Sequence, residues 1–140
     1  MRIPAETRLK LIQAAIRAKE HAYSPYSHFR VGAALLSVDG QIVEGASIDN
    51  ACYGAALCAE RTAIVKAMSE GIKDFIALAV TSDILKPIPP CGLCRQVIQE
   101  FCPPEMPVLL VSADYQKRDI GSADDGIVST VVGQMFPSKR

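Results

Sequence analysis

Residues 58–63, CAERTA, place a thiol and a carboxylate two positions apart at the expected start of a helix. Ala59 and Ala63 favour a helix, and the mostly apolar residues that follow continue the pattern. Cys58 and Glu60 would point in different directions from this helix start, so we do not expect them to bond to each other. On this fragment alone, a buried cysteine before a solvated glutamate is the ordinary interpretation. A shared chemical site requires support from elsewhere in the chain.

A second group of thiols occurs in the stretch PCGLC, where Cys91 and Cys94 form a Cys-x-x-Cys pair. Such a pair can be a redox dithiol, part of a metal site, or two buried cysteines. A metal site needs further ligands, and Cys58 lies 33 residues before Cys91, also at an expected helix start. Because two helix starts can meet at the ends of neighbouring strands, the three thiols can contribute to one site.

Three cysteine ligands would leave one position of a tetrahedral zinc ion open, which is typical of a catalytic rather than a structural site. The partial positive charge at helix N-termini stabilises the excess negative charge of three thiolates. Arg61 and Arg95 each lie within a turn of a thiol and can donate to sulfur. Glu60 can then take a proton from the metal-activated water and deliver it to a leaving group. This combination indicates hydrolysis.

The remaining thiols and imidazoles lack a metal-ligand spacing to one another. We expect Cys52 and Cys102 to be buried apolar residues. His28 is expected at the surface or in a turn, and His21 near the C-terminal end of a helix.

The elements that position these residues follow from hydrophobic periodicity and turn signals. Asp39-Gly40 is a hairpin signal, and Gly71 is a plausible end of the helix that begins near Cys58. The apolar runs at 75–82 and 107–113 are typical of covered strands. We expect helices at 5–22, from about 58 to 71 and at 92–101. We expect strands at 30–38, 41–45, 75–82, 107–113 and 127–132, and for the last of these a short helix is the alternative. This order predicts an α/β fold, a three-layer α/β/α sandwich with a mixed five-stranded sheet, in a single domain over residues 1–140.

The bulk composition fits a globular protein with a small-molecule partner. The chain has 140 residues, of which 49% are hydrophobic, and its 15 basic residues balance its 15 acidic ones. A polynucleotide partner held by phosphate contacts would need a basic face, so we expect no nucleic-acid polymer. We find neither a signal-peptide pattern nor a membrane-spanning run, and therefore expect no membrane partner and a cytoplasmic location.

At this point the motifs resemble those of a known family. CAERTA and PCGLCRQVIQEF, together with AYSPYSHFRVGAALL and GASIDNACYG, are similar to the homotetrameric, zinc-dependent cytidine deaminases of the free-nucleoside type, over roughly residues 5–112. The resemblance implies a cytidine deaminase-like fold and one Zn²⁺ per subunit. It also implies hydrolytic deamination of cytidine and 2′-deoxycytidine to uridine and 2′-deoxyuridine plus ammonia, a step of pyrimidine salvage.

Carried over by position, the resemblance implies that Cys58, Cys91 and Cys94 bind zinc and that Glu60 moves the proton. Arg61 would bond to zinc-bound sulfur. The implied substrate-binding residues are the flanking aromatic Phe29, the backbone N–H of Ala59, the sugar contacts Ser47 and Asp49, and Tyr53 and Phe136, which would reach a neighbouring subunit's pocket in a homotetramer with shared active sites.

Two segments depart from the family pattern. Ser47-Ile48-Asp49-Asn50 stands where the family usually has Asn-x-Glu-Asn, so we expect weaker or shifted sugar recognition. Val131-Val132-Gly133 stands where the family usually has Leu-Leu-Pro, which bears on the match at Phe136. A deaminase of a modified nucleoside or cytosine-bearing antibiotic therefore stays an alternative. A non-enzymatic zinc-stabilised interaction domain is a further one, and it would need a fourth protein ligand but no Glu60.

Overall fold

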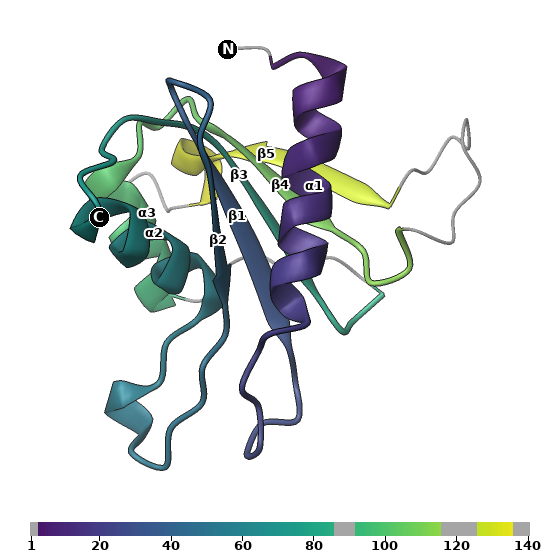
Figure 1. Ribbon diagram of the computed structural model, residues 1–140, viewed down its shortest axis with the longest axis vertical. Coiled ribbons are helices and arrows are strands. Elements are labelled where there is room, and N and C mark those ends of the chain that lie inside the picture. Colours follow the sequence, from purple (N-terminus) through teal and green to yellow (C-terminus); the bar gives the residue numbers. More distant parts are fainter. Residues whose placement is uncertain (1–2, 86–91, 116–125, 136–140) are drawn as a thin grey trace.

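The computed structural model describes residues 3–85, 92–115 and 126–135, and these build one five-stranded sheet with helices on both faces (Figure 1). The strand order across the sheet is β2-β1-β3-β4-β5. The elements are α1 (Ala5–Lys19), β1 (Val31–Ser37), β2 (Ile42–Ala46), η1 (Tyr53–Ala55), α2 (Ala59–Ser69), β3 (Phe75–Ser82), α3 (Gly92–Phe101), β4 (Pro107–Val111), β5 (Ile127–Val131) and η3 (Val132–Met135).

The sheet is mixed, as the sequence predicted. β1 and β2 form an antiparallel hairpin around Gly40, whose φ of 92° suits glycine. β1 also pairs antiparallel with β3, and β4 pairs antiparallel with β5. β3 and β4 are parallel and therefore need a crossover, in which α3 lies. The three-layer α/β/α prediction is confirmed.

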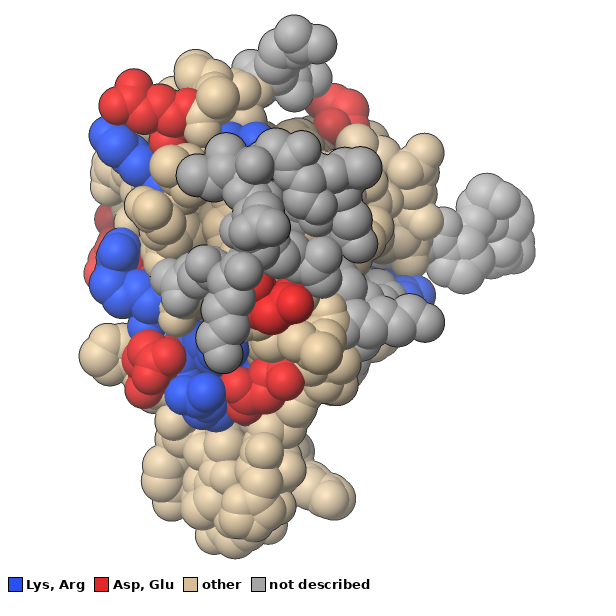
Figure 2. Space-filling model, turned by 90° about the vertical axis from the view of Figure 1, so that its right-hand side faces the viewer, with Lys and Arg blue, Asp and Glu red and all other residues tan. Residues whose placement is uncertain are grey.

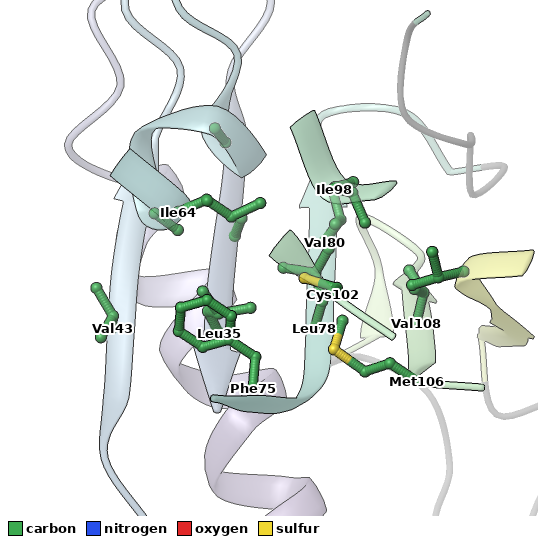
Figure 3. Close-up of a cluster of buried hydrophobic side chains, with 14 of the residues drawn as sticks. Leu35, Val43, Ile64, Phe75, Leu78, Val80, Ile98, Cys102, Met106 and Val108 are labelled. Carbon is green, nitrogen blue, oxygen red and sulfur yellow. The ribbon is translucent and has the colours of Figure 1, made fainter. Parts of the chain in front are cut away.

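Two hydrophobic cores lie on opposite faces of the sheet because successive strand residues point to opposite sides. In β1, Ala33 and Leu35 join the core beneath α2 and α3, whereas Ala34 and Leu36 join the core beneath α1. Figure 3 shows the first core, in which Leu35 lies among side chains from neighbouring strands and from α2 and α3. The helices that carry the predicted thiols are thus fixed on one buried face.

The first helix is shorter than the predicted 5–22, since α1 ends at Lys19. After it, the backbone N–H groups of Glu20, His21 and Ala22 bond to carbonyls three residues earlier, which tightens the chain into a turn. Of the two alternatives for residues 127–132, the strand is present as β5, and a short helix, η3, follows it and shares only Val132 with that range. Among the described residues, no helix is both long and apolar enough to cross a lipid bilayer.

Gly45 lets α2 approach the sheet closely. A Cβ atom at this position would lie 2.4 Å from the backbone N of Ala63 and 2.6 Å from the carbonyl O of Ala59. We expect Gly45→Ala to lower the free energy of unfolding by about 2–3 kcal/mol, because backbone cannot yield as a flexible side chain can. Urea denaturation measures the loss. Gly54→Ala is the control, since nothing lies within 4 Å of its Cβ position; a loss at Gly45 no larger than the loss at Gly54 would refute this packing argument.

Candidate active site

The N-terminus of α2 holds Cys58 and Glu60 where the sequence predicted a helix start. Cys58 is the residue that caps the helix, with extended backbone (φ −73°, ψ 156°), and Glu60 lies in the first turn. The helix ends in the predicted way. The N–H of Gly71 bonds to the carbonyl of Met68 and that of Ile72 to the carbonyl of Ala67, and Gly71 has a φ of 87°.

Glu60 is a buried acid, with 4% of its surface exposed. Burial raises the pKa of its carboxyl to about 7, and the neighbouring Cys58 also acts to raise it. The thiol of Cys94 donates to Oε1 of Glu60 across 3.9 Å. The alternative interpretation of a solvated glutamate after a buried cysteine is therefore wrong, because the acid points inward and contacts a thiol from another helix.

Cys58 and Cys94 come from the first turns of two different helices, α2 and α3, and meet around Glu60 and Arg61. Nη2 of Arg61 donates to Sγ of Cys58 at 3.8 Å and to the carbonyl of Ala56 at 3.2 Å. Burial acts to lower the pKa of Arg61, but the thiols of Cys58 and Cys94 outweigh it, so the pKa lies above its ordinary value. The predicted contact between Arg61 and sulfur is present.

These groups fit a zinc ion. Soft thiolates are ligands that zinc prefers. Within the described ranges, no three or more His, Cys, Asp or Glu side chains form a cluster that could hold a metal ion. In the same ranges, the buried Nε of Arg61 has no hydrogen-bond partner. Cys58 and Cys94 are two of the three expected ligands. The third, Cys91, directly precedes α3 but lies outside the described residues.

A pocket of about 310 Å³ opens beside this cluster. The residues that line it are Cys58, Glu60 and Arg61, residues at the ends of β3 and β4 (Val80, Thr81, Ser82 and Val111), and Ser27, Phe29, Val31, Ser47, Ile48, Asp49, Ala56 and Leu57. A pocket lined by both a half-buried aromatic side chain and a buried acid can hold a planar heterocycle.

Of the predicted substrate-binding residues, Phe29, Ser47 and Asp49 line the pocket. Ala59 is buried beside it at the start of α2. Tyr53 does not line it: its side chain is 93% exposed in η1. Phe136 lies outside the described residues.

The two expected structural cysteines differ. Cys102 is buried as predicted, and burial raises the pKa of its thiol to about 12. Cys52 is exposed, so its prediction as a buried residue is wrong. It belongs to residues 51–55, all of them exposed, in the segment between β2 and α2 that projects from the sheet (Figure 1).

Ser47 and Asp49 bond to residues 26–31, a segment distant in the sequence that also lines the pocket. Oγ of Ser47 accepts from the backbone N–H of Val31 at 3.0 Å. The carboxylate of Asp49 accepts from the backbone N–H groups of Tyr26 (3.1 Å) and Ser27 (2.9 Å) and from the hydroxyl of Ser27 (3.2 Å). Both polar side chains thus hold the segment that carries Phe29.

Sequence reasoning missed Ser27 and Thr81 as pocket residues. Ser27 belongs to the SPYS stretch, whose similarity to the family was noted without a role for this residue. Thr81 breaks the apolar run of β3 near its end, and this was the available signal. Its hydroxyl donates to the carbonyl of Val111 at 3.0 Å, and this bond links β3 to β4 where both line the pocket.

Asp83, which directly follows β3, holds the segment that carries Phe29 and Val31. It accepts from the backbone N–H of Arg30 at 2.9 Å and from its guanidinium at 3.0 Å, and lies 3.3 Å from Nζ of the buried Lys19. Burial acts to raise the pKa of Asp83, but hydrogen bonds from Arg30 and Lys19 outweigh it and hold the pKa below its usual range.

Asp83→Asn should therefore lower the free energy of unfolding by about 2 kcal/mol at about pH 6, because the buried Lys19 ammonium loses its counter-charge. A depressed pKa stabilises the fold above the unfolded-state pKa and loses this effect as the pH falls through the folded-state value. The difference between wild type and variant should accordingly shrink as the pH falls below about 4, the unfolded-state pKa of an aspartate. Urea denaturation at several pH values, with the exposed Asp74→Asn as control, measures it; a pH-independent difference would contradict the ionic explanation.

Comparisons with known proteins find matches over most of the chain. The family described as "Cytidine and deoxycytidylate deaminase zinc-binding region" matches residues 5–110. A cytidine deaminase of Halalkalibacterium halodurans is 56% identical over 103 residues, which are 74% of this chain and 78% of that protein. A cytidine deaminase of Sporosarcina psychrophila is 54% identical over 74% of this chain and 76% of its own length. The 1.6 Å crystal structure of a cytidine deaminase from Burkholderia pseudomallei superposes with a TM-score of 0.80 at 38% identity, covering 97% of this chain and 98% of that one.

Proposed function

The chain belongs to the zinc-binding cytidine and deoxycytidylate deaminase family, and from this premise we propose that it hydrolyses cytidine and 2′-deoxycytidine to the uridine forms and ammonia. The observation that carries the proposal is the buried carboxyl of Glu60, which contacts the thiol of Cys94, lies two residues after Cys58 and lines a pocket of about 310 Å³. An acid in this place can exchange a proton with a base bound in the pocket.

Cys58, Cys91 and Cys94 would hold one zinc ion, which supplies Lewis-acid activation of water. Glu60 removes one proton from the attacking water and delivers it to N3 of the pyrimidine while the water oxygen bonds to C4. The second water proton goes through Glu60 to the amino group, the C4–N4 bond breaks, and ammonia leaves. The product has a proton on N3 and a carbonyl at C4, so all atoms balance.

The pocket supplies groups that orient a pyrimidine for this transfer. Phe29 contributes an aromatic side chain to the lining of the pocket that Glu60 also lines. The first backbone N–H groups of α2, including that of Ala59, have no partner within the helix and can donate to a base carbonyl. Arg61 acts on the sulfur of Cys58 and so balances the charge of the thiolates.

The assembly would be a homotetramer with shared active sites. Residues 50–57, which include Tyr53, contain no Lys, Arg, Asp or Glu. This segment and the 20–30 segment project from the same end of the sheet (Figure 1), and the lower end of the face in Figure 2 is formed by uncharged residues. An exposed tyrosine on an uncharged projection favours a protein partner. Light scattering of wild type and Tyr53→Ser measures the assembly, and a wild-type monomer with full activity would overturn it. Because the thiols must stay reduced, we place the reaction in the cytoplasm.

The test is a substrate panel on the purified protein. We expect loss of ultraviolet absorbance and matching ammonia release with cytidine and 2′-deoxycytidine, and none with single-stranded polynucleotides. Turnover of a sugar-modified cytosine nucleoside without turnover of cytidine would favour the alternative substrate class. That class stays an alternative because Asp49 is bonded to Tyr26 and Ser27. Zinc bound by a catalytically inactive protein with a fourth protein ligand would instead indicate an interaction domain.

A further inference from the structure

Asp49 is a pocket residue whose carboxylate already has hydrogen-bond partners in the protein. Three donors reach it, the backbone N–H groups of Tyr26 and Ser27 and the hydroxyl of Ser27. A carboxylate offers about four lone-pair directions, so three protein donors leave room for about one more bond. Those donors hold the pKa of Asp49 below its usual range, with the Ser27 backbone N–H the largest stabilising contribution.

The partners of Asp49 belong to the loop formed by residues 24–30, which carries Phe29 into the pocket. Tyr26 and Ser27 lie 23 and 22 residues from Asp49 in the sequence, so their bonds to Asp49 join two separate segments. His28, at the centre of the loop, has a φ of 53°, a conformation that a non-glycine residue rarely adopts. A loop with such a residue needs bonds from outside to keep its shape.

Ser27 connects Asp49 to Phe29 through hydrogen bonds. Its Oγ accepts from the backbone N–H of Phe29 at 3.2 Å while its hydroxyl reaches Asp49. The loop is closed on its other side by the hydroxyl of Ser24, which donates to the carbonyl of Phe29 at 3.2 Å. A short chain of hydrogen bonds therefore leads from Asp49 through Ser27 to the residue that faces the base.

We propose that Asp49 is a positioning residue that holds the 24–30 loop, and with it Phe29, and that it is not the group that discriminates the sugar hydroxyls. The substrate named in this inference rests on the proposed function. The hydrogen bonds that support the inference are those of the protein without a ligand. It follows that Asp49 should contribute little to any loss of kcat/KM when a cytosine nucleoside is altered at the 3′ position.

The kinetic test compares cytidine with 3′-deoxycytidine in wild type, Asp49→Ala and Asp49→Asn. If Asp49 acts through the loop, Asp49→Ala should lower kcat/KM for both substrates by the same factor, about 10- to 100-fold. Asp49→Asn should recover part of the loss, because its amide oxygen still accepts from the loop. If Asp49 instead binds the 3′-hydroxyl, cytidine alone should lose about 10-fold or more, and the proposal would be overturned. Unchanged kinetics with both substrates would overturn it as well.

Hydrogen exchange on the substrate-free protein provides a second readout that does not depend on activity. Asp49→Ala should speed exchange at the amides of Tyr26 and Ser27 by about 10-fold or more, with a smaller effect in Asp49→Asn. Asp39→Ala is the matched control, since Asp39 also accepts from a serine hydroxyl and from a nearby side chain, but in the distant β1–β2 turn. Unchanged protection of the 24–30 loop in Asp49→Ala would contradict the proposal. A wild-type protein that does not deaminate cytidine would refute the proposed function, and the exchange result would still decide the role of Asp49.

Discussion

Glu60→Gln should lower kcat for cytidine by about 10³- to 10⁴-fold while one zinc per chain is retained. The amide keeps the size of the carboxyl and fits the same buried position, so the protein should fold normally. It cannot take a proton from water or deliver one to N3, and Asp49, the other carboxyl among the described residues that line the pocket, is bonded to Tyr26 and Ser27. Steady-state kinetics with metal analysis of the same preparation measures both quantities.

Glu70→Gln is the matched control for this experiment. Glu70 is exposed at the C-terminal end of the same helix and should keep wild-type activity in the variant. If Glu60→Gln were as active as Glu70→Gln, the assigned role of Glu60 would be wrong, and the buried carboxyl would need another explanation.

Cys94→Ala should lower the affinity for zinc by more than about 100-fold and abolish deamination with it, because the ion loses one of three protein ligands. The side chain of Cys94 is fully buried and contacts Glu60, so the loss affects both the metal and the acid. Competition with a zinc chelator measures the affinity, and ammonia release measures the activity.

Cys102→Ala separates this effect from the loss of a buried thiol. Cys102 follows α3, is buried in the core beneath α2 and α3, and does not line the pocket. Its variant should lose stability but keep zinc and activity. Equal zinc affinity in the Cys94 and Cys102 variants would remove Cys94 from the ligand set.

The sequence predicted the parts of the fold and site that depend on local pattern. The continuous apolar runs of β3 and β4, the hairpin at Asp39-Gly40 and the helix end at Gly71 are all local signals, and each is present in the structure. The start of α2 at Cys58 follows from the same kind of signal. The convergence of α2 and α3 was an inference from topology, and the contact between Cys94 and Glu60 agrees with it.

The sequence could not indicate contacts of residues whose surroundings come from distant parts of the chain. Cys52 was expected in the core because free cysteines usually are, but its loop projects from the sheet. The carboxylate of Asp49 bonds to residues 26 and 27, and nothing in residues 47–50 indicates these partners. The length of α1 depended on how the chain turns after Lys19, whose ammonium is held by Ser82 and Asp83 from another strand.

The central claim is that a thiolate-bound zinc and Glu60 together deaminate cytidine, and graded metal reconstitution tests it most directly. The protein would be stripped of zinc with a chelator, reloaded with increasing amounts, and assayed for conversion of cytidine to uridine and ammonia at each zinc content. We expect activity to rise in proportion to bound zinc, from zero to a maximum at one zinc per chain. Full activity in the zinc-depleted protein, or full loading without any ammonia release, would contradict the account.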